Sequence, residues 1–441
     1  MHFPSSGLPE GALSRLGAAR GRLRRRPALR LLVVSQYFWP EPFRVNDLAA
    51  ELARRGHEVT VLTGTPNYPE GLTYPEFARD PRGFASYAGT EIVRVPLVPR
   101  GKTSLRLALN YLSFVLTGLT LGLWRLRGRR FDAVVMVQHS PITSALPALA
   151  LRRLKRAPLL MWVLDLWPES LAAVGGVRSP RVLAWAGALV GFIYKRCDRV
   201  LVQSRAFVAN VEKYSGDTTR IRYFPSWAEP IFDGPLADVT AAPEVAPYRA
   251  TFNVLFAGNI GDAQDFPAIL DAAEALREEV DLRWLIVGDG RAADWVRSEI
   301  TRRGLGPNVV MLGRHPIERM PSFFRAASVL LVALKKDPIF AMTIPGKVQS
   351  YLATGVPIVG MLDGEGAAVI EQAGAGLVCA AGAGRQLAER VRALMRMPAG
   401  EREAMGERGR RYCEQEFSRA RLMSTLEAWT QELVDVRPAR P

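Results

Sequence analysis

The chain has 441 residues, 48% hydrophobic and 23% charged, which is typical of a folded protein large enough for two or three domains. Its three cysteines and four histidines show neither paired nor metal-ligand spacing, which argues against a disulfide scaffold and a zinc site. The net charge of +15 lies wholly in residues 1–232, with 33 Lys and Arg against 16 Asp and Glu, so an anionic partner is expected.

The first segment, residues 1–29, is an arginine-rich leader without the apolar stretch of a signal peptide. Two interpretations remain open. It is either a disordered arm that contacts lipid headgroups, or a dispensable tail added by an upstream start codon.

After the leader, apolar strand patterns alternate with helical ones through residues 30–232. Strands are predicted at 31–34, 59–62, 92–95, 134–137, 159–163 and 199–202, with a helix at 47–55. This alternation is typical of a parallel, doubly wound sheet, so we assign residues 30–232 to a first Rossmann-like domain.

One segment of this domain, residues 107–124, carries no charge and is flanked on both sides by arginines. It is near the minimum length for a membrane span, but both flanks are basic and no charge asymmetry orients it. We therefore expect a helix that lies in the membrane interface or is partly buried, with an ordinary buried helix as the alternative. A second apolar run, 182–194, is too short to span and is expected in the core.

The alternation breaks at residues 227–249, which are rich in Pro, Ala and Asp and are typical of a linker. A second cycle follows, with strands predicted at 253–256, 284–287, 309–312, 329–332, 358–359 and 377–378. We assign residues 233–417 to a second Rossmann-like domain and 418–441 to a C-terminal helix that can cross back to the first. The fold class is α/β, with a ligand cleft between the two domains.

Glycines follow three successive strands of the second domain, in the stretches 257–261, 288–290 and 313–314. Glycine at the end of a strand lets the backbone approach a phosphate closely. A helix expected to begin after Pro345-Gly346 carries Lys347 in its first turn, where an anion would be favoured. Together they predict a nucleotide site. No P-loop and no dinucleotide-binding fingerprint occurs, so an ATPase and a classical dehydrogenase are disfavoured.

Six longer stretches of the sequence are distinctive: VSQYFWPEPFRVNDL (34–48), RGHEVTVLTG (55–64), PNYPEG (66–71), DLWPES (165–170), FPSW (224–227) and AGNIG (257–261). Together they resemble glycosyltransferase family 4, in the bacterial branch with lipid-linked fucosamine and colanic-acid-type transferases. The resemblance runs from about residue 31 to 417.

The resemblance implies the GT-B fold, two doubly wound domains that face a central cleft. It implies a membrane-associated enzyme that retains anomeric configuration and moves a sugar from a UDP- or GDP-linked donor to a polyprenyl-diphosphate-linked acceptor. It implies a role in bacterial surface polysaccharide synthesis, without a cofactor, a metal or a covalent protein intermediate. The chain is then expected at the cytoplasmic face of the inner membrane, as a peripheral or monotopic protein, with no nucleic-acid partner.

The chain departs from the family at two acidic positions, because Met342 and Ser350 stand where the family has two glutamates. Lys347 is therefore our candidate for the donor diphosphate. The residue that holds the ribose stays open, with Glu365 as one candidate and a solvated loop glutamate as its alternative role.

The candidate residues fall into three groups. Asp165 is expected to bind sugar hydroxyls or act as a base, or else to cap the following helix, and His139 is a catalytic candidate or a structural residue. The full set is Asp165, Glu169 and His139 for catalysis; Gly258, Asn259, Gly261, Gly288, Gly290, Arg314, Lys347 and Glu365 for the donor; and Arg44, Asn46 and Asn67 in the cleft.

Three other functions remain possible from the sequence, of which a nucleic-acid binder rests on the charge alone. The missing glutamates suggest a non-catalytic homologue that binds nucleotide or lipid. The two-domain architecture also fits a nucleotide-sugar epimerase, although an epimerase has no use for the basic, apolar segment.

Overall fold

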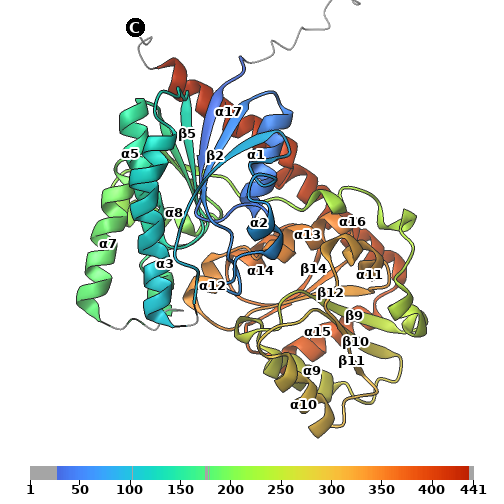
Figure 1. Cartoon of the computed structure of the whole chain (residues 1–441). Helices are drawn as coiled ribbons and strands as arrows, with labels where there is room; N and C mark the ends of the chain where they lie inside the picture. Colours follow the sequence, from blue (N-terminus) through green and yellow to red (C-terminus); the bar gives the residue numbers. More distant parts are fainter. Residues whose placement is uncertain (1–26, 102, 174–176, 178, 437–441) are drawn as a thin grey trace, which may run out of the picture.

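The computed structural model describes residues 27–101, 103–173, 177 and 179–436. They form two α/β domains, each built on a twisted and largely parallel sheet (Figure 1). All of the predicted leader except residues 27–29 lies outside the described residues.

The first sheet has eight strands in the order β3-β4-β2-β1-β5-β6-β7-β8, and only β3 runs antiparallel to its neighbour. The strands are β1 (Arg30–Val34), β2 (Glu58–Gly64), β3 (Ser86–Tyr87), β4 (Thr90–Val95), β5 (Ala133–Gln138), β6 (Leu159–Val163), β7 (Arg199–Val202) and β8 (Ile221–Tyr223). The six strands predicted for this domain are confirmed. The other two, β3 and β8, have two and three residues, too few for a periodic pattern.

Helices cover both faces of this sheet, which is why its strands read as unbroken apolar runs. One face packs against α3 (Ser104–Thr117), α5 (Leu146–Lys155), α7 (Pro180–Tyr194) and α8 (Phe207–Ser215). The other face packs against α1 (Arg44–Arg54) and α17 (Arg419–Asp435).

The second sheet has six parallel strands in the order β11-β10-β9-β12-β13-β14. They are β9 (Phe252–Ala257), β10 (Leu282–Val287), β11 (Val309–Gly313), β12 (Val329–Ala333), β13 (Ile358–Met361) and β14 (Gly376–Cys379), all at the predicted places. Its helices include α9 (Phe266–Ala275), α10 (Ala293–Arg302), α13 (Gly346–Thr354), α14 (Glu365–Gln372) and α15 (Gly384–Arg396).

The chain returns to the first domain through α16 (Ala399–Glu416) and α17, the helix drawn in red across the top of Figure 1. Leu422, Met423 and Leu426 of α17 are buried in the core of the first domain. Arg419 pairs with Asp47 of α1 at 2.9 Å. The end of the chain therefore packs against the first domain, and the two domains are connected both by the linker and by α16 and α17.

The apolar segment forms α3, a π-helical turn (Gly118–Gly122) and α4 (Leu123–Arg125) in succession. This 22-residue helix is long and apolar enough to cross a membrane by length and composition alone. One side packs on the domain through Asn110, Phe114 and Val115. The other side exposes a stripe of leucines at helical spacing, Leu105, Leu109, Leu112 and Leu116, between 43% and 71% accessible.

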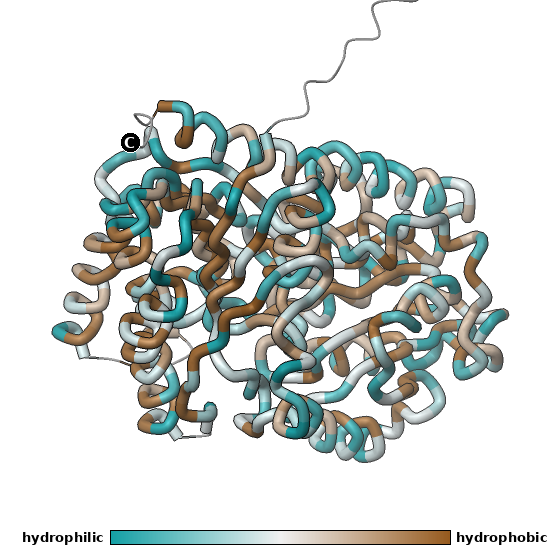
Figure 2. The backbone as a smooth tube through the Cα atoms, turned by 45° about the horizontal axis from the view of Figure 1, so that its top comes forward, coloured by the Kyte–Doolittle hydropathy of each residue, from teal (hydrophilic) through white to brown (hydrophobic). Residues whose placement is uncertain are grey.

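The second apolar helix, α7, lies beside α3 in Figure 1. The expectation that it packs in the core is wrong for one of its faces. Val182, Trp185 and Phe192 are exposed, while Val190 and Ile193 are buried. Figure 2 shows hydrophobic residues both in the central strands and along these outer helices.

Candidate active site

A cavity of about 910 Å³ lies where the two domains and their linker meet. The ends of β9, β10 and β11 and the start of α13 form most of its wall. Tyr68 and Pro69 of the first domain and Glu229 and Phe232 of the linker form the rest. The carboxyl ends of parallel strands are where α/β folds bind ligands, so this cavity is the candidate active site.

The glycines predicted at these strand ends permit close packing of the cavity wall. Gly258 has φ +130° and Gly288 has φ +147°, conformations that other residues rarely adopt. A Cβ atom on Gly258 would lie 2.7 Å from Cε of Lys347, and one on Gly288 would collide with the carbonyl of Gly258. Glycine therefore brings exposed backbone and the Lys347 amine together in the cavity.

Lys347 points into this cavity from the first turn of α13. Its Nζ lies 3.5 Å from the centroid of the Phe256 ring, and desolvation lowers the pKa of the amine to about 7. No carboxylate among the described residues pairs with it. An anion bound here would restore the charge of the ammonium and would also meet the free N–H groups of the helix start.

Glu229 joins the two domains at the edge of the cavity. Its Oε1 accepts a hydrogen bond from Arg44 Nη2 at 2.7 Å, and its Oε2 accepts one from Ser350 Oγ at 2.5 Å. Two of the four acceptor positions of a carboxylate are thereby used, and two remain for a ligand. Glu229 thus places a negative charge beside Ser350, the position where the resembled family has a glutamate.

The position of Glu229 is fixed by aromatic residues just before it. Trp227 is fully buried, stacks on Trp162 at 5.5 Å, and donates from its indole to Asp47. Because this anchor is only two residues away, the carboxylate has little freedom. Glu229 was not predicted from the sequence, since a single glutamate in a linker has no periodic or local signal. The preceding Phe-Pro-Ser-Trp stretch was the only nearby motif that pointed to this segment.

On the first-domain side, His139 follows β5 and Asp165 follows β6. The His139 ring meets Phe43 edge-on at 4.7 Å, its Nε2 has no hydrogen-bond partner among the described residues, and burial lowers its pKa to about 4. Burial raises the pKa of Asp165 to about 6, against hydrogen bonds that include Ser170 at 3.1 Å. The imidazole is therefore neutral, and the carboxylate can change its charge near pH 6.

Asp165 is not the cap of the helix that follows. That helix, α6 (Glu169–Ala173), begins four residues later, so the capping alternative does not describe its geometry. Glu169 turns away toward α8, where its Oε1 accepts from the Tyr214 hydroxyl at 2.9 Å.

Other candidates hold loops in place. Asn46 bonds to the backbone of Trp39 and Glu41, and Asn67 accepts from the backbone N–H of Arg100 at 2.8 Å. Glu365 begins α14 and accepts from the backbone N–H of Arg205 at 3.1 Å, a contact between the domains outside the cavity. Of the residues predicted from the sequence, those that line the cavity are Gly258, Asn259, Gly288, Gly290, Arg314 and Lys347.

Gly261 and Met342 lie near the cavity without lining it. The Gly261 N–H donates to Gln264 Oε1 at 3.1 Å, which fixes the loop after β9. The Met342 carbonyl accepts from Ser204 of the first domain at 2.5 Å. Met342, which stands where the resembled family has the first of its two glutamates, thus takes part in a contact between the domains.

Comparison with known proteins identifies two domain models on this chain. Residues 43–227 match the Glycosyl transferase 4-like domain, and residues 251–397 match the Glycosyl transferases group 1 domain. The chain is 24% identical, over 346 residues, to the putative colanic acid biosynthesis glycosyl transferase WcaI of Escherichia coli (strain K12), which covers 74% of this chain and 82% of WcaI.

Solved structures share the fold at low identity. Anabaena Alr3699/HepE, in complex with UDP and glucose, matches with a TM-score of 0.63 and 14% identity, over 91% of this chain and 99% of that one. WaaG, a glycosyltransferase involved in lipopolysaccharide biosynthesis, matches with a TM-score of 0.62 and 17% identity, also over 91% and 99%. With both domain models matched across most of its length, the chain belongs to the family 4-like glycosyltransferases of the GT-B fold.

Proposed function

We propose that this glycosyltransferase moves a sugar from a nucleoside diphosphate donor to a polyprenyl-diphosphate-linked acceptor during synthesis of a surface polysaccharide. The observation that carries the donor assignment is Lys347, whose amine has no carboxylate partner in the described part of the chain and lies in a cavity bounded by glycine turns. The similarity to WcaI and the UDP-bound HepE structure support a nucleotide-sugar donor and a polysaccharide product.

The proposed reaction breaks the bond between the anomeric carbon and the diphosphate oxygen and forms a bond to the acceptor hydroxyl oxygen. Lys347 and the backbone N–H groups near Gly258 stabilise the negative charge that develops on the departing diphosphate. The proton of the acceptor hydroxyl goes to that phosphate, while Asp165 orients the hydroxyl. The acceptor oxygen attacks on the same face of the sugar that the diphosphate leaves, so the configuration is retained without a covalent bond between the sugar and the protein.

A lipid-linked acceptor accounts for the exposed leucine stripe of α3 and the exposed face of α7. Together they present Leu112, Leu116, Trp185 and other apolar side chains to the surroundings. Such a surface on a strongly basic half suits an anionic membrane, to which each Lys or Arg adds about 1 kcal/mol near the surface.

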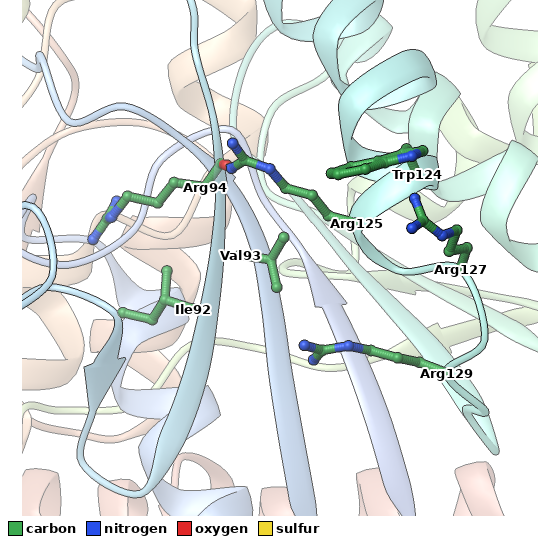
Figure 3. Close-up of a pocket in the computed structure, with 7 residues that line it drawn as sticks. All are labelled: Ile92, Val93, Arg94, Trp124, Arg125, Arg127 and Arg129. Atoms are coloured by element: carbon green, nitrogen blue, oxygen red, sulfur yellow. The ribbon is translucent and has the colours of Figure 1, made fainter.

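The end of this helix carries a basic groove, shown in Figure 3. Trp124 is 59% exposed, the Arg127 guanidinium lies 4.3 Å from its ring centroid, and Arg125 reaches toward the strand that holds Arg94. Tryptophan and arginine side by side are typical of the headgroup layer of a membrane. We therefore propose a peripheral or monotopic position at the cytoplasmic face of the inner membrane.

A panel of UDP- and GDP-sugars tests the donor assignment. At least one donor should bind, and the nucleoside diphosphate should be released faster when lipid-linked acceptor is present. Binding without any turnover would favour a non-catalytic homologue, which the changes at Met342 and Ser350 make a specific alternative. Release of an epimerised donor without acceptor would instead identify an epimerase.

A further inference from the structure

Arg100 lies in the loop between β4 and α3, just before the exposed apolar helix. Its backbone N–H donates to Asn67 Oδ1 at 2.8 Å, and its Nη1 donates to the Tyr37 hydroxyl at 3.3 Å. The guanidinium carbon lies 5.4 Å from the centroid of the Tyr68 ring. Both ends of this residue are thus held, so the guanidinium has a defined direction.

The guanidinium of Arg100 is half-buried, yet no carboxylate among the described residues pairs with it. The side chains that act on it electrostatically are the phenols of Tyr37, Tyr68 and Tyr111. Arg94, which is also largely buried, differs because it donates to the backbone carbonyls of Gly64 and Trp39. Arginine has five N–H donors, so Arg100 retains the capacity to bind an anion.

Tyr111 connects Arg100 with the candidate catalytic carboxylate. Burial raises the pKa of the Tyr111 phenol, Arg100 lowers it, and the charge of Asp165 raises it. The same phenol is hydrogen-bonded to Ser140, which follows β5. Arg100 and Asp165 are therefore both close enough to Tyr111 to change the pKa of its phenol.

On its other side, Arg100 is followed along the chain by the exposed apolar stripe of α3. The exposed stripe of α3 begins at Leu105, which is 71% accessible, and continues through Leu116. The basic groove of Figure 3 is at the opposite end of this helix, and its Arg129 is already paired with Glu91. Arg100 thus lies between Tyr68, which lines the cavity, and the start of the apolar stripe.

We propose that Arg100, with the hydroxyls of Tyr37 and Tyr111, binds the diphosphate of an isoprenoid-linked acceptor. The inference rests on the proposed function and names the acceptor site within it. The isoprenoid chain would leave along the α3 stripe, and the sugar next to the diphosphate would face Asp165. A reaction that attaches the first sugar phosphate to an isoprenyl phosphate must then supply this acceptor.

The test is a binding titration with the donor cavity saturated by a nucleoside diphosphate, so that the ligands cannot occupy the Lys347 site. Geranyl diphosphate, geraniol and inorganic pyrophosphate are each titrated into the full-length wild type, Arg100→Ala, Arg100→Lys and Tyr111→Phe. Arg106→Ala is the matched control, since Arg106 is exposed on α3, the helix that follows the Arg100 loop.

Wild type should bind geranyl diphosphate at least about tenfold more tightly than geraniol or pyrophosphate, and Arg100→Ala should remove that preference. Arg106→Ala should keep it. Equal binding of geranyl diphosphate by wild type and Arg100→Ala overturns the inference, as does a wild type that binds pyrophosphate equally well. If Arg100→Ala fails to fold, Arg100→Lys and Tyr111→Phe decide, because each must weaken geranyl diphosphate binding. Nucleotide binding measured in the same series reports separately on the proposed function.

Discussion

Donor binding should be linked to protonation of Lys347. In the free protein desolvation lowers the pKa of this amine to about 7, so at pH 8.5 most of it is neutral. A bound diphosphate favours the ammonium and raises its pKa. The terminal phosphate, with a pKa of about 6, is already ionised above neutral pH and takes up no proton. The proton consumed on binding above pH 7 is therefore that of Lys347.

The size of the pH effect on binding follows from the rise in the pKa of Lys347 when the diphosphate binds. Each pH unit above about 7 should weaken nucleoside diphosphate binding up to about tenfold, or ~1.4 kcal/mol, until the pKa of the bound state is reached. Lys347→Arg, which stays charged, should bind with little pH dependence. Lys347→Ala should bind weakly at every pH, by roughly 1.5–3 kcal/mol relative to wild type at pH 7.

Isothermal titration calorimetry at pH 8.5, in two buffers with different ionisation enthalpies, measures the proton uptake. Wild type should take up close to one proton per nucleotide, and Lys347→Ala should take up none. Equal uptake by wild type and Lys347→Ala would refute the assignment, because the proton would then belong to another group.

Three further outcomes follow from the structure. We expect Glu229 to accept hydrogen bonds from the donor ribose, since its free acceptor positions lie beside Ser350, where the resembled family has a glutamate. Glu229→Ala should therefore weaken binding of ribonucleotides more than of 2′- or 3′-deoxynucleotides, by about tenfold for a lost hydrogen bond to a charged group. Ser350→Glu in the same chain should restore the discrimination. Asp165→Asn should lower turnover without lowering the melting temperature at pH 7, because the raised pKa of Asp165 means that its ionised form costs stability as pH rises from about 4 to 6. Leu112→Glu with Leu116→Glu should release the protein from anionic liposomes while nucleotide binding stays unchanged.

Matched controls separate these effects from general damage. Glu365→Gln lies outside the cavity and should leave the discrimination between ribose and deoxyribose unchanged. Val280→Glu, at a position 74% exposed in the second domain, should leave liposome binding unchanged. A loss of melting temperature in Asp165→Asn that matches its loss of activity would assign Asp165 a structural role. Liposome binding that survives both leucine substitutions would reject the α3 surface as the membrane contact.

The sequence predicted the sheets well, because buried parallel strands such as β1 and β9 are unbroken apolar runs between turns. It also predicted where α13 begins and ends, since Pro345 and Gly355 mark both ends and Gly355 has the left-handed conformation of a helix C-terminus. The position of Lys347 in the first turn of α13 could be predicted because the start of this helix was predicted correctly.

The remaining site features depend on contacts between distant segments, which no local pattern records. Glu229 reaches Ser350 across 121 residues and Arg44 across 185. Glu365 had the expected charge at a strand-to-helix turn, but its turn faces Arg205 of the first domain. The exposed face of α7 was misjudged because apolar composition indicates burial without saying whether protein or membrane provides it.

Incorporation of a labelled sugar into lipid measures the proposed transfer itself. Membranes carrying lipid-linked acceptor are incubated with radiolabelled UDP- and GDP-sugars, and the butanol-extractable lipid is counted for wild type and Lys347→Ala. Wild type should transfer label from at least one donor into lipid, and Lys347→Ala should reduce that transfer by about one to two orders of magnitude. Label that never enters the lipid fraction from any donor, or that enters equally with Lys347→Ala, would contradict the account.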